Sequence, residues 1–220
     1  MYCANPAREI SMIKVAIAYH SLHGHTARLA HAAAKGCGSI EGVTANLVEI
    51  RKEDIQEGRW KNATAIEILN ASDAIMFGSP TFMGDTSAVF KMFLEWAFDP
   101  WLRQAWKDKF AAAFTNSASQ NGDKLNTLQS LSVFAMQMGM IWVGVGDPPG
   151  NNWSGGSRND INRLGTWVGA MGQSHGDSDA GTEPPDSDCE TVSRLARRLS
   201  LITKRFKEGG EYETEYIAAR

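Results

Sequence analysis

The sequence has few cysteines and little net charge, and both absences narrow the possible classes of protein. Its three cysteines are Cys3, Cys37 and Cys189, an odd number without the spacing of a metal site. We therefore expect free thiols in a reducing compartment and no bound metal. A formal charge of −3 and a pI of about 6.0 provide no basic surface for nucleic acid, so no nucleic-acid partner is expected.

Long apolar runs are also missing. A membrane span needs about 18 or more apolar residues, whereas the nearest stretch, residues 131–145, is interrupted by Ser132, Gln137 and several glycines. Residues 1–12 lack the apolar core of a secretory signal and contain Arg8 and Glu9. We expect a cytoplasmic protein without a membrane span.

The length of 220 residues fits one domain that buries enough surface to fold without disulfide bonds or structural metal ions. We expect a flexible leader over residues 1–12, one folded domain over residues 13–208 and a flexible tail over residues 209–220. Residues 144–181 carry ten of the 21 glycines. A loop region this long inside a compact domain is usually functional or disordered.

Short apolar segments alternate with longer helical patterns along the chain. The expected strands are residues 14–19, 45–50, 74–78, 110–116 and 140–146. The expected helices are residues 26–36, 63–71, 85–98, 125–138 and 189–208. Because most of the strands are apolar on both faces, they predict an α/β fold: a doubly wound five-stranded parallel sheet with helices on both faces. In such a sheet, ligands bind beyond the carboxyl ends of the strands.

The first loop at that edge, residues 21–26 (SLHGHT), opens the first expected helix. Backbone N–H groups at a helix N-terminus favour an anion, Gly24 lets the backbone come close, and Ser21 and Thr26 add hydroxyl donors. A simple helix cap is the alternative. The loop has neither a Walker ending nor the GxGxxG pattern, so a phosphate here would belong to a mononucleotide.

The second and third loops follow the third and fourth expected strands. The second, residues 79–84 (SPTFMG), is stiffened by Pro80 and Gly84 and is apolar at Phe82 and Met83, which suits a flat aromatic ring. The third, residues 115–123 (TNSASQNGD), offers small polar side chains and backbone amides that can satisfy a polar heterocycle. By itself, the second loop could equally be a loop that packs onto its own helix. By itself, the third loop is better explained as an ordinary solvated turn.

Together the three loops suit one ligand, with its phosphate at the first loop and its ring across the other two, which is the layout of FMN in flavodoxins. The motifs SLHGHT, FGSPTFMG with KMFLE, and FTNSASQNG with MGMIWVGVG resemble those of the WrbA family, the flavodoxin-like NAD(P)H:quinone oxidoreductases. The resemblance extends from about residue 13 to residue 205. It implies a flavodoxin-like fold, FMN as the cofactor, NAD(P)H as the electron donor and a quinone or similar small aromatic compound as the acceptor.

The resemblance also implies roles for individual residues. The phosphate would be held by the first loop and His23 would lie near the nicotinamide, unless it is simply a surface histidine. Trp101 would wall the quinone site, unless it is a core or interface tryptophan. No side chain is expected to act as a catalytic acid or base, because FMN carries the chemistry. The full set of expected cofactor contacts is Ser21, Leu22, His23, Gly24, His25, Thr26, Pro80, Thr81, Phe82, Met83, Gly84, Thr115, Asn116, Ser117, Ala118, Ser119, Gln120 and Met138.

Two positions depart from the family pattern. The second loop commonly reads Thr-Arg-Phe-Gly in the family, but Thr81 is followed here by Phe82 and Met83. Met138 replaces a family histidine that contacts flavin or substrate. Both changes make the expected pocket more apolar.

The expected function is therefore hydride transfer from NAD(P)H to quinone-type acceptors by a ping-pong mechanism. One alternative is a flavodoxin-type electron carrier, although such carriers are usually strongly acidic and this chain is not. Another is a cofactor-free interaction module with the same fold. The family is commonly tetrameric, with sites completed by a neighbouring subunit, so a homo-oligomer (dimer or tetramer) is expected.

Overall fold

The computed structural model describes residues 12–209, so nearly all of the expected leader and tail lies outside the described residues. Five strands, each parallel to its neighbours, follow one another across a seven-stranded sheet in the order β2-β1-β5-β7-β8. Their bounds are β1 Ile13–Tyr19, β2 Val43–Glu49, β5 Ala74–Phe82, β7 Phe110–Ser117 and β8 Ile141–Trp142. The order reverses direction at β1 and β5, as the expected doubly wound sheet requires. The α/β prediction is confirmed.

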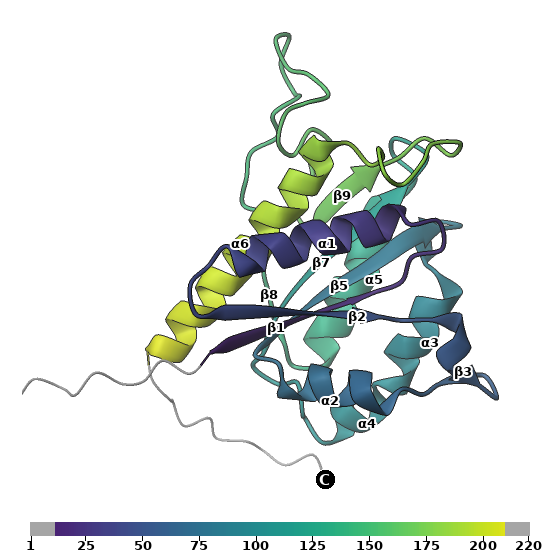
Figure 1. Cartoon of the computed structure of the whole chain (residues 1–220), viewed down its shortest axis with the longest axis vertical. Helices are drawn as coiled ribbons and strands as arrows, with labels where there is room; N and C mark the ends of the chain where they lie inside the picture. Colours follow the sequence, from purple (N-terminus) through teal and green to yellow (C-terminus); the bar gives the residue numbers. More distant parts are fainter. Residues whose placement is uncertain (1–11, 210–220) are drawn as a thin grey trace, which may run out of the picture.

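Helices cover both faces of this sheet (Figure 1). One face is covered by α1 His25–Gly38 and α6 Asp186–Glu208, and the other by α2 Ala63–Ala71, α3 Ala88–Trp96 and α5 Lys124–Gln137. The side chains of β1 alternate between the two layers: Val15 and Ile17 pack under α1 and α6, and Ala16 and Ala18 pack toward the opposite helices. Both faces of β1 are thus buried, which explains its continuous apolar sequence.

The fifth strand differs from the prediction for residues 140–146. Only β8 pairs with the first residues of β7, while β9 Ala170–Gln173 pairs with the last residues of β7. The chain leaves the sheet between them because the N–H of Val145 donates to the carbonyl of Trp167 and not to β7. The side chain of Asn162 ties this excursion together by donating to the carbonyls of Asp147 and Thr166, both at 3.0 Å.

Several smaller elements also differ from the prediction. β5 continues to Phe82, and β6 Asp85–Thr86 pairs back onto it, so α3 begins only after Ser87, whose Oγ accepts from the N–H of Phe90. Further elements that we did not predict are the 3-10 helix η1 Lys52–Asp54, the hairpin of β3 Ile55–Gln56 and β4 Arg59–Trp60, and the short helix α4 Phe98–Leu102. No helix within residues 12–209 is long and apolar enough to cross a membrane.

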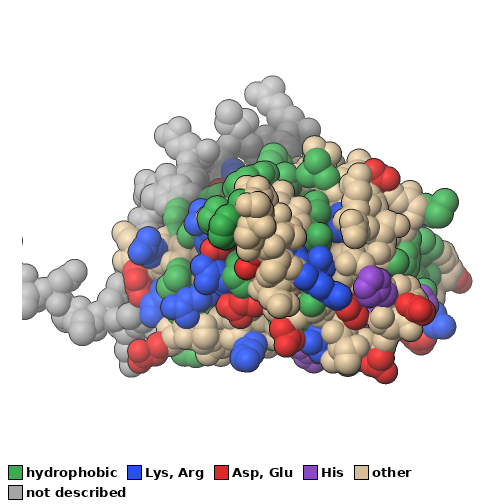
Figure 2. Space-filling view, turned by 90° about the horizontal axis from the view of Figure 1, so that it is seen from above, with side chains coloured by type: hydrophobic (Ala, Val, Ile, Leu, Met, Phe, Trp, Pro, Cys, Tyr) green, Lys and Arg blue, Asp and Glu red, His purple; other side chains and the backbone are tan. Residues whose placement is uncertain are grey.

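Charged side chains are mixed on the surface. In Figure 2, the Lys and Arg side chains of the described residues lie among Asp and Glu side chains on the face shown. The ion pairs Arg28–Asp186 and Arg194–Asp147 link α6 to other segments of the chain at 2.7 Å. Exposed pairs of this kind contribute little to stability, typically below about 1 kcal/mol.

The contact between α1 and α6 depends on a glycine. A Cβ atom at Gly36 would lie 2.2 Å from the carbonyl oxygen of Ser193, whereas a Cβ at Gly38 would have no neighbour within 4 Å. We predict that Gly36→Ala lowers the free energy of unfolding by about 2 kcal/mol, since overpacking outweighs the gain in helix propensity. Gly38→Ala should leave it unchanged or raise it by up to ~1 kcal/mol. Urea denaturation of both variants checks the pair; equal effects would contradict the packing argument.

Candidate functional site

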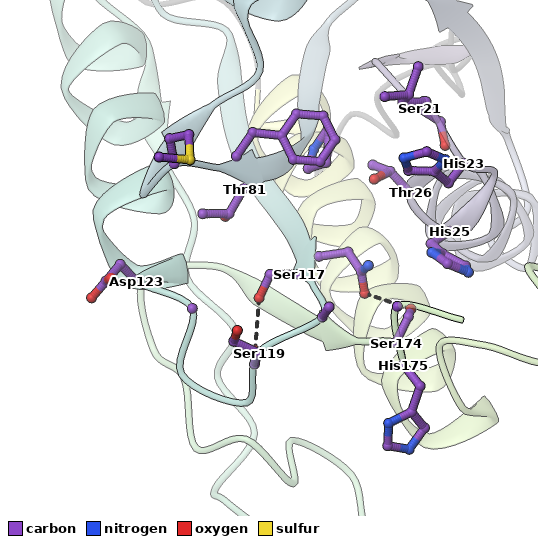
Figure 3. Close-up of a pocket in the computed structure, with 18 of the residues that line it drawn as sticks. Ser21, His23, His25, Thr26, Thr81, Ser117, Ser119, Asp123, Ser174 and His175 are labelled. Atoms are coloured by element: carbon purple, nitrogen blue, oxygen red, sulfur yellow. Dashed lines mark hydrogen bonds between the residues drawn. The ribbon is translucent and has the colours of Figure 1, made fainter. Parts of the chain in front are cut away.

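A cavity of about 710 Å³ opens at the carboxyl edge of the sheet, where β1, β5, β7 and β9 end (Figure 3). All three loops that we singled out border it. The expected residues that line it are Ser21, Leu22, His23, His25, Thr26, Pro80, Thr81, Phe82, Met83, Gly84, Asn116, Ser117, Ala118 and Ser119. Segments that are nearly 100 residues apart in the chain therefore meet at one site, because parallel strands bring their carboxyl ends to the same edge.

The first loop presents the N-terminus of α1 to the cavity. Gly24 precedes the helix at φ 84°, and a Cβ there would lie 2.7 Å from the Cβ of Ala180, so both the backbone conformation and the space require glycine. The Oγ of Ser21 accepts from the N–H of Ala27 at 3.1 Å. Figure 3 places Ser21, His23, His25 and Thr26 together on one side of the cavity. Their N–H and hydroxyl groups make this end suitable for an anion.

The second loop is more regular than expected, because residues 79–82 still belong to β5. Thr81 is buried, and its Oγ1 lies 2.8 Å from Oγ1 of Thr115 and 2.7 Å from Oγ1 of Thr127. This chain of three buried hydroxyls joins β5 to β7 and α5. Beyond it, Met83 at φ 50° turns the chain and its side chain is fully exposed. The cavity is thus rigid at its floor and apolar at its rim.

The third loop is held in place by hydrogen bonds within the loop and from Gln173 and Lys124. Ser117 Oγ donates to the carbonyl of Ser119 at 2.9 Å, and Gln173 Nε2 donates to the carbonyl of Ala118 at 3.1 Å. Lys124, at the start of α5, is completely buried and donates to three oxygen atoms of the same loop. Desolvation lowers the pKa of Lys124 to about 8, opposed by the nearby carboxylate of Asp188.

The carboxylate of Asp188 is itself buried and bound. Its Oδ1 accepts from Nε of Arg163 at 2.7 Å, and its Oδ2 accepts from the N–H of Gln173 at 2.9 Å. Burial raises the pKa of Asp188 above its usual range, and the hydrogen bond from Arg163 acts in the opposite direction. This pair attaches α6 to the excursion before β9 and so fixes the fourth wall of the cavity.

Sequence reasoning missed that fourth wall. Ser174, His175 and Gly176 follow β9 and line the cavity, and Ser174 Oγ donates to Oδ1 of Asn116 at 3.1 Å. Gly122 and Asp123 also line it. The glycine-rich composition of residues 144–181 indicated a functional region. Without the expectation of β9, however, the loop after it could not be placed beside the other three.

Some expected contacts do not line the cavity. Thr115 and Gly24 are absent from its lining, although Oγ1 of Thr115 lies 2.8 Å from Oγ1 of Thr81. Gln120 borders a separate hollow of about 370 Å³ that Trp167 also lines. These residues still shape the loops to which they belong.

Met138 and Trp101 do not line this cavity. Both line another cavity, of about 330 Å³, together with Phe98 and Phe134. For Met138 the reason is geometric: α5 begins at the first cavity and runs 14 residues away from it, which is about 20 Å, and Met138 caps its far end. Within one chain, neither residue reaches the first cavity, so any contact there would need a second copy of the chain.

The fold and the site together define a class of protein. A doubly wound sheet, a helix N-terminus rich in hydroxyls at one end of the cavity, and an apolar turn with backbone amides at the other are typical of α/β proteins that bind a mononucleotide at the sheet edge. The volume also falls within the range usual for small-molecule sites.

Comparison with known proteins agrees with that class. Residues 13–153 match the family described as NADPH-dependent FMN reductase. The chain is 43% identical over 192 residues to "Flavodoxin FldP" of Pseudomonas aeruginosa, covering 87% of this chain and 97% of that protein. It is 28% identical over 208 residues to an "NAD(P)H dehydrogenase (quinone)" of Solidesulfovibrio magneticus, covering 89% and 100%. The crystal structure of a flavodoxin, WrbA-like protein from Agrobacterium tumefaciens superimposes with a TM-score of 0.66 at 34% identity, covering 88% and 98%.

The chain belongs to the NADPH-dependent FMN reductase family. Its flavodoxin-like fold and its resemblance to WrbA are confirmed. FMN and NAD(P)H, the expected cofactor and donor, are those of its family and relatives.

The buried hydroxyl chain under the cavity generates a stability prediction. Thr81→Val removes the central hydroxyl and leaves those of Thr115 and Thr127 without this partner, so we expect the free energy of unfolding to fall by about 2 kcal/mol. Thr203→Val is the control: it is equally buried, but its hydroxyl bonds only to its own helix at Leu199, and its effect should stay below ~1 kcal/mol. Urea denaturation measures the free energy of unfolding of both variants. Similar losses would show that the hydrogen bonds among the three hydroxyls do not add to stability.

Proposed function

We propose that this protein is an FMN-dependent oxidoreductase that transfers a hydride from NAD(P)H to a quinone or similar small aromatic acceptor by a ping-pong mechanism. Membership of the FMN reductase family and the relatives named quinone dehydrogenases support an oxidoreductase. The observation that carries the proposal is that the anion-binding end and the apolar end lie in one cavity.

The residues present fit FMN. The N-terminus of α1 with Ser21 and Thr26 would hold the phosphate, since backbone N–H groups and these two hydroxyls lie at that end of the cavity. Phe82 and Met83 would border the ring, and the loop at Ser117–Ser119 would meet its polar edge. FMN supplies the redox chemistry when it is bound.

The residues of the chain would bind FMN, orient the donor and the acceptor, and limit access to the cavity. The floor formed by Thr81 and its hydroxyl partners is rigid, whereas the rim is exposed at Phe82 and Met83. An open apolar rim lets a flat nicotinamide enter and leave, and then lets a flat acceptor take the same place. No acidic side chain is required, because the chain neither adds nor removes a proton in this scheme.

A flavodoxin-type electron carrier is the second candidate. It is favoured by one observation: the relative that is 43% identical over nearly its whole length carries the name flavodoxin. A carrier of this kind would bind FMN in the same cavity without oxidising NAD(P)H. A cofactor-free interaction module, our third hypothesis, would bind no FMN.

We predict that the purified protein shows the visible absorption bands of oxidised flavin and that NADPH or NADH bleaches them. Benzoquinone should then restore the bands and sustain NAD(P)H oxidation, with the parallel double-reciprocal plots of a ping-pong mechanism. Bands that persist after NAD(P)H is added would favour the electron carrier. A colourless protein that takes up no FMN on reconstitution would favour the interaction module.

We predict that Thr26→Val weakens FMN binding by roughly tenfold to a hundredfold, because it removes a hydroxyl that donates to a charged group. Riboflavin, which lacks the phosphate, should bind both proteins equally. Fluorescence titration of the apoprotein measures the two affinities, with Thr203→Val as a variant remote from the cavity. Equal losses for FMN and riboflavin would show that Thr26 does not contact the phosphate.

A further inference from the structure

Lys124 occupies an unusual position for a lysine. It is the first residue of α5, where the helix dipole disfavours a cation, and its side chain is completely buried. A buried ammonium group is costly unless every N–H has a partner. Lys124 Nζ meets that requirement with three bonds of 2.8–2.9 Å, to Ser117 Oγ and to the carbonyls of Ser119 and Gln120.

These bonds orient three successive peptide groups. The carbonyl of Ala118 is bound by Gln173, and those of Ser119 and Gln120 are bound by Lys124. In a trans peptide, the C=O and the following N–H point in opposite directions. The N–H groups of Gln120 and Asn121 therefore point away from the ammonium, and the N–H of Ser119 points away from the side chain of Gln173. Residues 117–119 of that loop form a wall of the cofactor cavity.

The turn that follows the loop is equally constrained. Gly122 and Asp123 both have positive φ, at 57° and 53°, and a Cβ at Gly122 would lie 2.3 Å from Ser117 Oγ. These two residues turn the chain into α5 directly after the loop, so that the ammonium of Lys124 can bind the oxygen atoms of residues 117, 119 and 120. Figure 3 shows Ser117 and Ser119 bonded to each other on the cavity wall that faces Ser21 and Thr26.

The charged groups around Lys124 leave a positive balance. Burial lowers the pKa of Lys124, the carboxylate of Asp188 raises it and the guanidinium of Arg163 lowers it. Asp188 and Arg163 form a buried ion pair with each other. With Lys124 protonated, the three groups carry one net positive charge behind the loop. Outward N–H groups backed by a buried positive charge favour a ligand edge that carries carbonyl oxygens or negative charge.

We propose that Lys124 is a positioning residue that holds the loop at residues 117–120 with its N–H groups outward, so that the cavity binds the polar ring edge of FMN and favours its reduced, more negative form. This inference rests on the proposed FMN site. The phosphate would occupy the N-terminus of α1, which leaves the dioxo edge of the ring to face this loop. A purely structural role for Lys124 predicts lost stability but no preference between the two forms.

The chain offers a matched control. Lys109 is also largely buried, its pKa is also lowered to about 8 by desolvation, and its Nζ donates to two carbonyls, those of Leu69 and Asn70. It lies before β7, at the opposite edge of the sheet from the cofactor cavity. Lys109→Met thus repeats the chemical change of Lys124→Met without touching the loop.

The test compares FMN binding by wild type, Lys124→Met and Lys109→Met. We expect Lys124→Met to weaken the binding of oxidised FMN by up to tenfold and the binding of reduced FMN by a further tenfold. This difference lowers the two-electron midpoint potential of the bound cofactor by about 30 mV. Lys109→Met should leave the ratio of the two affinities at the wild-type value. In the apoproteins, the NMR order parameters of the amides of residues 119–121 should fall from about 0.85 to below about 0.6 in Lys124→Met only.

An unchanged affinity ratio in Lys124→Met would overturn the proposal, even if stability or the order parameters fall. Should Lys124→Met fail to fold, Lys124→Gln keeps two N–H donors without the charge, and the same ratio is measured there; a wild-type ratio would again refute the inference. Failure of the proposed function is seen separately, in a wild-type chain that binds no FMN or does not oxidise NAD(P)H. The amide measurement on the apoprotein still decides whether Lys124 orders the loop.

Discussion

The parallel pairing of β5 with β1 on one side and β7 on the other is the constraint on which the site depends. It brings the carboxyl ends of all three strands to one edge and so places the SLHGHT, SPTFMG and TNSASQNG segments around one cavity. The ring of Phe114 on β7 lies over Gly78 on β5, where a Cβ would be 2.2 Å from the ring.

Buried polar groups then turn this edge into a rigid site. The hydroxyls of Thr81, Thr115 and Thr127 connect two strands to α5, and Asp188 connects α6 to Arg163 and to the backbone of β9. Such groups are tolerated in a core when they have hydrogen-bond partners, and each of these has at least one. Because their partners come from distant segments, the walls of the cavity keep a fixed geometry without a ligand.

The apolar rim and the polar floor have different chemical tasks in the proposed reaction. Phe82 and Met83 are exposed at the rim, so the proposed donor and acceptor would meet apolar side chains there. The positive charge of this site lies instead behind the third loop, at Lys124. The chain thus places its cation beneath the loop that is to meet the polar edge of the ring.

The sequence by itself determined the strands β1 and β7 and the helices α1 and α5 within one or two residues. It also determined the start of β5 and the position of the three loops, because each depends on local periodicity and on glycine or hydroxyl residues next to a strand end. Tertiary structure decided the rest. Whether residues 140–146 stayed in the sheet depended on the pairing of Val145 with Trp167, and this pairing created β9 and the wall at Ser174–Gly176. The direction of α5 carried Met138 away from the site, and burial converted Lys124 from an ordinary helix residue into a support of the third loop. Such contacts join residues far apart in the chain, and no local pattern encodes them.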